Sequence, residues 1–191
     1  MQMRGRYVVK FLLLSQPRTG SRLLCSLLNS HPAIGCTHES CKAPEHRNES
    51  VFTQISLECP GKSVLVAHAH HGFLTDELRE LDVPKIVLTR KDYVRASLSA
   101  IFMNIPRAQG FRAKQSIVNA MIEARKASDA ALMKYADFVI DYSEFADNNA
   151  QTSRVELSSL LSFLGVAQAT LTTTAIRSPF VEPCNLAELY G

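Results

Sequence analysis

The chain lacks any pair of cysteines in a CxxC arrangement, and its cysteine count is odd. The five thiols are Cys25, Cys36, Cys41, Cys59 and Cys184. This pattern argues against a disulfide framework and against a zinc site built from paired thiolates. We therefore expect reduced thiols and a cytoplasmic protein.

Long hydrophobic runs are also missing. The most apolar stretch near the start consists of residues 7–9 and 11–14, separated by Lys10. A membrane-spanning helix needs about 20 apolar residues, so this stretch is too short. It continues directly into a polar turn rather than into the small-residue cleavage site of a secretory signal. We expect a soluble chain with no membrane span.

A strong charge of either sign is absent. The 21 basic and 18 acidic residues leave a net charge of +3, and the basic residues are scattered. The sequence thus lacks the electrostatic footprint of a nucleic-acid-binding protein, and we expect no nucleic-acid partner. A few cations gathered around one small anionic ligand would account for the excess.

What the chain does contain is a regular alternation of short apolar runs with longer helical patterns. Strands are expected at about residues 7–14, 63–67, 85–89 and 138–141. Helices are expected at about residues 20–28, 75–81, 91–102, 111–135 and 154–164, and residues 40–62 are expected to form a polar loop. This order is typical of a three-layer α/β/α fold with a central parallel sheet of four to five strands. With 46% apolar residues, the 191 residues are enough for one core, so a single domain over 1–191 is expected.

The long helix at 111–135 carries apolar residues at three- and four-residue spacing. They are Ile117, Met121, Ala124, Ala127 and Ala131. Such spacing predicts one buried stripe, and therefore a packing role for the helix.

The first candidate site lies where the strand at 7–14 turns into the helix at 20–28. A helix that begins near Thr19, Gly20 or Ser21 directs its unpaired backbone N–H groups and positive dipole end towards an anion. Arg18, Thr19 and Ser21 add side-chain donors. The turn lacks the Gly-Lys-Ser/Thr ending of a nucleoside triphosphatase loop, which disfavours ATP hydrolysis.

A second strand-to-helix turn follows the strand at 85–89. Arg90 and Lys91 lie at the turn, and Ser97 and Ser99 follow on the helix. An arginine at a strand end and a serine on the next helix can bind one phosphate together, the arginine through its forked donors and the serine through its hydroxyl. The sequence therefore predicts a second anion site.

Both turns resemble motifs of sulfotransferases that use 3′-phosphoadenosine 5′-phosphosulfate (PAPS). Residues 17–24, Pro-Arg-Thr-Gly-Ser-Arg-Leu-Leu, and the following 27–32 look like the 5′-phosphosulfate loop and first helix of that family. Residues 86–99 resemble its 3′-phosphate motif. In the family motif a fixed spacing separates the basic residue at the strand end from the serine on the helix. Counted from Arg90 this spacing falls on Leu98, and counted from Lys91 it falls on Ser99. Ser97 lies one residue before Leu98. We prefer Arg90 and Ser99, with Lys91 assisting.

The resemblance extends to the late strand and helix at 138–145 and 161–166, so that it spans roughly residues 8–166. It implies a P-loop-like sulfotransferase fold, PAPS as sulfuryl donor, the product 3′-phosphoadenosine 5′-phosphate (PAP), no metal requirement, and a small-molecule, lipid or carbohydrate acceptor. The cofactor-binding residues it implies are Arg18, Thr19, Gly20, Ser21, Arg22, Arg90 and Ser99. It also implies that Arg18 stabilises the leaving group. The family's lysine-containing 3′-phosphate segment has no counterpart, for which Arg107, Arg112 or Lys114 would substitute.

Two residues compete for the role of the general base that deprotonates the acceptor. His68, expected at the end of a strand, has about the placement of the catalytic histidine of cytosolic sulfotransferases. Glu39 matches the position of the catalytic glutamate in bacterial and carbohydrate-modifying relatives. Histidine is already poised near neutral pH, whereas a carboxylate needs burial to raise its pKa. We rank Glu39 slightly ahead because the sequence around it, Thr-His-Glu-Ser at residues 37–40, is closer to the bacterial type.

Other functions remain open on the sequence. A metal site formed by His68, His70 and His71, with Glu39 as a further ligand, is one alternative, but no zinc spacing is present and we expect no metal. A nucleotide or small-molecule kinase with a degenerate loop is one alternative to a sulfotransferase. A non-catalytic nucleotide-binding module on the same fold is another.

Overall fold

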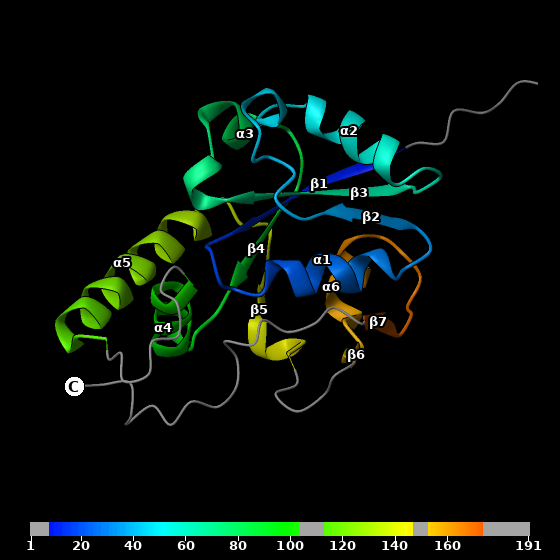
Figure 1. The fold of residues 1–191 in the computed structure, drawn as a ribbon. Coiled ribbons are helices and arrows are strands. Elements are labelled where there is room, and N and C mark those ends of the chain that lie inside the picture. The colour runs from blue at the N-terminus through cyan, green and yellow to red at the C-terminus, as the bar shows by residue number, and fades with distance from the viewer. Residues whose placement is uncertain (1–7, 104–112, 147–152, 174–191) are drawn as a thin grey trace, which may run out of the picture.

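The structure, a computed structural model, describes residues 8–103, 113–146 and 153–173. Its centre is a sheet of five parallel strands in the order β2-β3-β1-β4-β5, shown in Figure 1. The strands are β1 (Val9–Ser15), β2 (Ile34–Thr37), β3 (Val64–His70), β4 (Lys85–Thr89) and β5 (Phe138–Asp141). The prediction of an α/β fold with a parallel sheet of four to five strands is confirmed.

Helices connect the strands and flank the sheet. They are α1 (Ser21–Asn29), α2 (Ser50–Glu58), α3 (Asp76–Glu80), α4 (Tyr93–Met103), α5 (Gln115–Met133) and α6 (Ser158–Phe163). Short 3-10 helices lie at Pro44–His46, His71–Phe73 and Tyr142–Glu144, and β6 (Ser153–Val155) pairs antiparallel with β7 (Leu171–Thr173).

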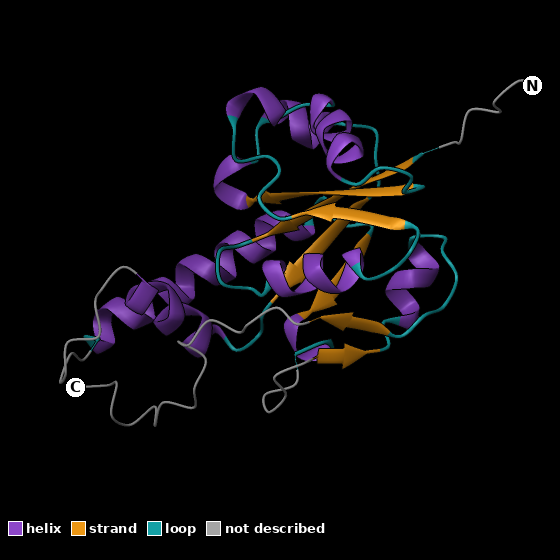
Figure 2. Cartoon of the chain, turned by 45° about the vertical axis from the view of Figure 1, so that its right-hand side comes forward, coloured by secondary structure: helices purple, strands orange, loops and turns teal. Residues whose placement is uncertain are grey.

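Alternation along β1 places two apolar cores on opposite faces of the sheet. Phe11 and Leu13 pack with α1 and α6, whereas Leu12 and Leu14 pack with α2 and α3. Figure 2 shows helices on both sides of the sheet. A strand buried on both faces reads as a continuous apolar run, as β1 does. Burying one such leucine contributes about 1.5–3 kcal/mol, so β1 is held firmly.

The position of β1 determines where a ligand can bind. The chain adds β2 and β3 on one side of β1 and then crosses to add β4 and β5 on the other. In open parallel sheets, ligands bind outside the carboxyl ends of the strands, at the point where the direction of winding changes. Both predicted anion turns lie at this edge, after β1 and after β4.

The structure corrects several predicted bounds. Residues 40–62 are not one loop, since they contain α2, and β2 was not predicted at all. The strand expected at 63–67 continues to His70. The helix expected at 154–164 begins only at Ser158, because residues 153–155 form β6. Tyr7, Arg107 and Arg112 lie outside the described residues, and Lys114 is the residue that precedes α5.

Two further predictions concern the described residues alone. No helix among them is both long and apolar enough to cross a membrane. The four cysteines in this part of the chain, Cys25, Cys36, Cys41 and Cys59, are free thiols.

Candidate functional site

The loop between β1 and α1 has the backbone shape of an anion-binding turn. Arg18 has a φ of 67° and Gly20 a φ of 93°, both in the left-handed region. Gly20 is the residue that precedes the first turn of α1, and it has no side chain with which to cap the helix. Turns that include left-handed residues before a helix direct successive N–H groups towards one point. The loop therefore has the backbone shape expected of the first predicted anion turn.

The aromatic ring of Tyr142 lies directly against Gly20. A Cβ atom at Gly20 would come within 2.3 Å of Tyr142 Cδ2. The Arg90 guanidinium lies over the same ring, with Cζ 4.5 Å from its centroid. Tyr142 therefore connects the first turn to the second, and only glycine fits at position 20.

The two predicted anion turns are in direct contact with each other. Arg90 Nη1 donates a hydrogen bond to the backbone oxygen of Arg18 at 3.1 Å, and Arg18 Nε donates to Ser99 Oγ at 2.9 Å. Burial, followed by the charges of Arg90 and Arg22, lowers the pKa of Arg18. The arginines thus leave an excess of positive charge at this edge, which an anion would relieve.

The two candidate serines on α4 have different surroundings. Ser99, rather than Ser97, contacts Arg18. Ser97 Oγ is buried and has no hydrogen-bond partner among the described residues. Leu98 packs instead with Ala113 and Val118. Ser99 is thus joined to the first turn through Arg18, and its pairing with Arg90 around one phosphate stays a prediction.

The face of α5 that the structure buries differs from the predicted apolar stripe. The buried residues are Val118, Arg125, Asp129 and Leu132. Of the predicted stripe, Ile117 is 50% exposed, and Ala124 and Ala127 are also exposed. The prediction was wrong because part of the buried face is polar and contacts the loop between β1 and α1 rather than an apolar core.

Arg125 and Asp129, on α5, hold the loop between β1 and α1 through hydrogen bonds. Arg125 Nη2 donates to the backbone oxygen of Pro17 at 2.8 Å. Gln16 Nε2 donates to the backbone oxygen of Arg125 at 2.7 Å and to the Asp129 carboxylate. Burial raises the pKa of Asp129, and Gln16 and Tyr93 oppose this shift by hydrogen bonding. Positions 118, 125, 129 and 132 share one helical face, so this spacing was the available signal for the contact.

The predicted side-chain donors of the first loop are used differently. Thr19 is 1% exposed, and its hydroxyl donates to the backbone oxygen of Gln16 at 2.8 Å, which closes the turn. Ser21 Oγ lies 3.2 Å from His38 Nε2. Arg22 is exposed on α1. In this arrangement Arg18 and the backbone of the loop are better placed than Thr19 to meet a ligand.

Glu39 lies in the loop after β2, close to the Lys42 ammonium and the His70 imidazole. Its backbone φ of 56° is left-handed, an uncommon state for a non-glycine residue. Glu39 Oε1 is 3.3 Å from His70 Nε2, and Oε2 is 3.8 Å from Lys42 Nζ. The side chain is about one-third exposed, at 33%, so a substrate can reach it.

His68 is enclosed, because β3 continues past it to His70. It is 0% exposed, with Nε2 2.9 Å from Ser15 Oγ, and Nδ1 accepts a hydrogen bond from the Glu39 backbone N–H at 2.9 Å. A backbone N–H always donates, so Nδ1 is unprotonated and Nε2 carries the proton. The expected position at a strand end was wrong, and neither ring nitrogen is free to meet an acceptor.

Buried neutral histidines make stability depend on pH. Burial, with smaller effects of His70 and His38, lowers the pKa of His68 well below its usual value, and burial lowers the pKa of His38 to about 4. The unfolded chain therefore binds more protons than the folded one below a pH of about 6.5. Stability is expected to decrease as the pH falls from about 6.5 towards 5, before most carboxylates titrate.

Urea unfolding at several pH values in this window checks the expectation. His68→Gln keeps a donor and an acceptor at this position but cannot titrate, so it should flatten the dependence. His71→Gln serves as the matched control, because His71 lies outside the cluster of His38, His68 and His70. A free energy of unfolding that is the same at both ends of the window would contradict the argument.

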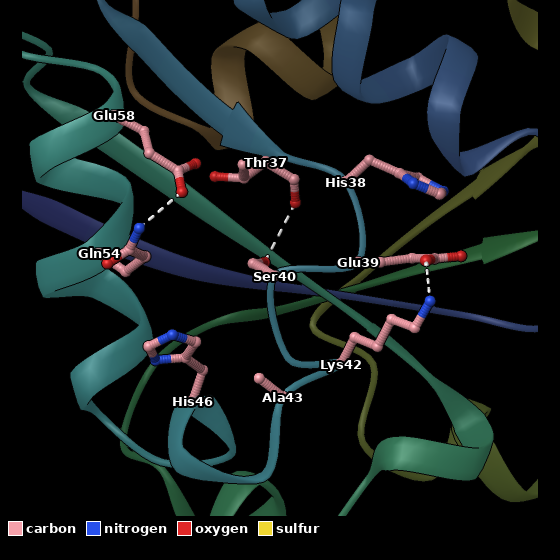
Figure 3. A pocket seen from close by; sticks show the side chains of 9 residues that line it. All are labelled: Thr37, His38, Glu39, Ser40, Lys42, Ala43, His46, Gln54 and Glu58. Atoms are coloured by element: carbon pink, nitrogen blue, oxygen red, sulfur yellow. Dashed lines mark hydrogen bonds and ion pairs between the residues drawn. The ribbon is translucent and has the colours of Figure 1, made fainter.

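A polar pocket of about 450 Å³ opens beside Glu39. Figure 3 shows Gln54 and Glu58 reaching in from α2 on one side, and the loop after β2 on the other. Its lining residues are Thr37, His38, Glu39, Ser40, Lys42, Ala43, His46, Gln54 and Glu58. The pocket is thus open to a small molecule, and Glu39 is among the residues that line it.

The chain as a whole was compared with known proteins. No family model matches it, and neither does any curated protein.

Proposed function

We propose that this protein is a PAPS-dependent sulfotransferase with a P-loop-like sulfotransferase fold. The observation that carries the proposal is the contact between the two strand-end turns. Arg18 touches Ser99 from one turn, and Arg90 touches the backbone of Arg18 from the other. PAPS carries anionic groups at its 5′ and 3′ positions, and two adjoining cationic turns suit such a ligand.

The roles of the nucleotide-binding residues follow from their places. The backbone of the loop at Gly20 and Ser21 binds the 5′-phosphosulfate. Arg90 and Ser99 bind the 3′-phosphate, and Lys91, which is exposed at the same turn, assists. The Arg125–Asp129 pair holds the loop in position through Pro17 and Gln16. Preformed donors of this kind lose little entropy when the anion binds.

Sulfuryl transfer then needs a cation and a base on opposite sides of the sulfur. The acceptor oxygen or nitrogen attacks sulfur and gives its proton to the Glu39 carboxylate, and the bond between sulfur and the 5′-phosphate oxygen breaks to release PAP. Arg18 stabilises the charge that develops on that oxygen, as positioned cations do in phosphoryl transfer. No step requires a metal ion.

Glu39 fits the role of the base better than His68. Glu39 borders the polar pocket and is partly exposed, whereas His68 is enclosed with both ring nitrogens in hydrogen bonds. His68 instead positions the Glu39 backbone. Lys42 and Glu58, which line the pocket, could hydrogen-bond to polar groups of a hydroxyl- or amine-bearing acceptor.

Thermal unfolding with added nucleotides tests the proposal. PAPS and PAP are expected to raise the unfolding temperature more than ATP at equal concentration, because ATP lacks the 3′-phosphate that Arg90 and Ser99 would bind. A ligand at 100 times its dissociation constant stabilises by about 2.7 kcal/mol, which is readily measured.

Two variants and three outcomes sharpen the test. Arg90→Gln should remove most of the preference for PAP, whereas Arg79→Gln, on α3 and paired with Asp76, should leave it unchanged. An equal response to ATP and PAPS would contradict the proposal. Magnesium-dependent phosphoryl transfer from ATP would favour the kinase, and PAPS binding without transfer to any acceptor would favour the non-catalytic module.

A further inference from the structure

Three histidines converge next to the polar pocket. One ring nitrogen from each of His38, His68 and His70 lies within 4.8 Å of the others. His38 follows β2, and His68 and His70 lie on the neighbouring strand β3. Their rings are in contact, with centroids 4.7 Å apart for His68 and His70 and 5.0 Å apart for His38 and His68.

We propose that His38, His68 and His70, together with the Glu39 carboxylate, form a binding site for a divalent transition-metal ion such as Zn²⁺. Three imidazoles with one carboxylate or water make up a common tetrahedral donor set for this ion. A Glu39 carboxylate that ligates the ion is not available as the base, so the metal-loaded site and sulfuryl transfer through Glu39 exclude each other in one molecule. Metal binding can be tested whether or not the chain uses PAPS.

His70 gives the strongest sign that a ligand is missing. The residue is 8% exposed, and within the described part of the chain its Nδ1 has no hydrogen-bond partner, while its Nε2 has only the contact with the Glu39 carboxylate. Buried polar side-chain atoms nearly always have a partner, so the unpartnered Nδ1 requires an explanation. Glu39 Oε1 lies 3.3 Å from His70 Nε2, about the separation of two donors on one tetrahedral zinc ion.

The remaining ligands reach the ion through small movements. Zinc–nitrogen bonds of about 2.0–2.1 Å require donors about 3.3 Å apart, so rings whose nitrogens lie up to 4.8 Å apart must move inwards by roughly 1 Å. His38 lines the pocket, which gives the ion a path from solvent. The strained backbone of Glu39, with φ at 56°, adjoins the site.

His68 must exchange one hydrogen bond to bind the ion. Its Nδ1 accepts from the Glu39 N–H, and its Nε2–H points to Ser15 Oγ. The metal takes the place of the Glu39 N–H at Nδ1, and the bond from Nε2–H to Ser15 stays. Ligating histidines usually donate their second N–H to a neighbouring acceptor, and here Ser15 supplies it.

The test uses the full chain without a histidine tag, freed of metal by a chelator and titrated with Zn²⁺ by calorimetry and with Co²⁺ by visible spectroscopy. We expect one ion per chain and a tetrahedral Co²⁺ spectrum. His70→Ala and His38→Ala should weaken binding at least tenfold. His71→Ala should bind as the unchanged protein does, because His71 does not belong to the three-histidine cluster.

Folding is checked for each variant by circular dichroism in the absence of metal, and His70→Gln replaces His70→Ala if the latter unfolds. Absence of one-to-one binding, or undiminished binding by the folded His70 and His38 variants, would overturn the proposal. An equal loss in the His71 control would also overturn it, since it would mean scattered surface binding.

Discussion

Replacing Arg18 with methionine is expected to lower the rate of sulfuryl transfer about 100- to 1,000-fold. Arg18 is the cation placed at the bend of the first turn, with Nε bonded to Ser99, and in the proposed reaction it meets the charge that develops on the leaving oxygen. Removing one preorganised donor to a developing anion costs about this much in other enzymes. Methionine keeps the apolar stem of the side chain while removing its charge.

The measurement needs no knowledge of the acceptor, because conversion of PAPS to PAP and sulfate by water reports the same bond breaking. The loss should appear in kcat more than in KM if Arg18 acts on the transition state. Arg18→Lys, which keeps the positive charge but lacks the forked N–H donors of the guanidinium group, should retain part of the rate. Arg79→Gln is the surface control. A methionine variant that turns over as fast as the unchanged protein would remove Arg18 from the mechanism.

Much of the fold could be predicted because apolar runs and strand-end turns are local signals. β4 and β5 were predicted with the bounds that the structure shows, since each is a short apolar run between polar turns. β2 has the sequence Ile-Gly-Cys-Thr, in which glycine and threonine interrupt the apolar run, and α2 follows a polar stretch, so neither produced a clear pattern. Their formation depends on packing against β3, which the sequence alone does not reveal.

The candidate site was predictable only in part, for a similar reason. The motifs around Arg18 and Arg90 lie within single strand-to-helix turns, where the order of residues indicates the geometry. The contact of Arg125 with Pro17 joins residues 108 positions apart. His38 joins His68 only because β2 and β3 are neighbours in the sheet. Such pairings depend on the topology of the sheet. The spacing of possible metal ligands along the sequence did not indicate the histidine cluster.

Replacing Gly20 with alanine is expected to destabilise the protein by roughly 2–5 kcal/mol and to abolish nucleotide binding. Two costs combine at this position. A left-handed backbone with φ at 93° costs an L residue about 1–2 kcal/mol. The new Cβ would also lie 2.3 Å from Tyr142 Cδ2, so the ring must move, and overpacking of this kind costs about 1–3 kcal/mol. Moving the ring also displaces Arg90, which lies over it.

Gly61→Ala separates the two costs, because Gly61 also has a positive φ, at 80°, but no atom lies within 4 Å of the position of its Cβ. Chemical unfolding of both variants should therefore show a small loss for Gly61→Ala and a clearly larger one for Gly20→Ala. Adding Tyr142→Ala to Gly20→Ala should recover part of the difference by making room for the methyl group, a coupling that a double-mutant cycle measures. Equal losses for the two glycine variants, with no coupling to Tyr142, would mean that backbone strain alone acts at Gly20 and that the ring does not hold the two turns together.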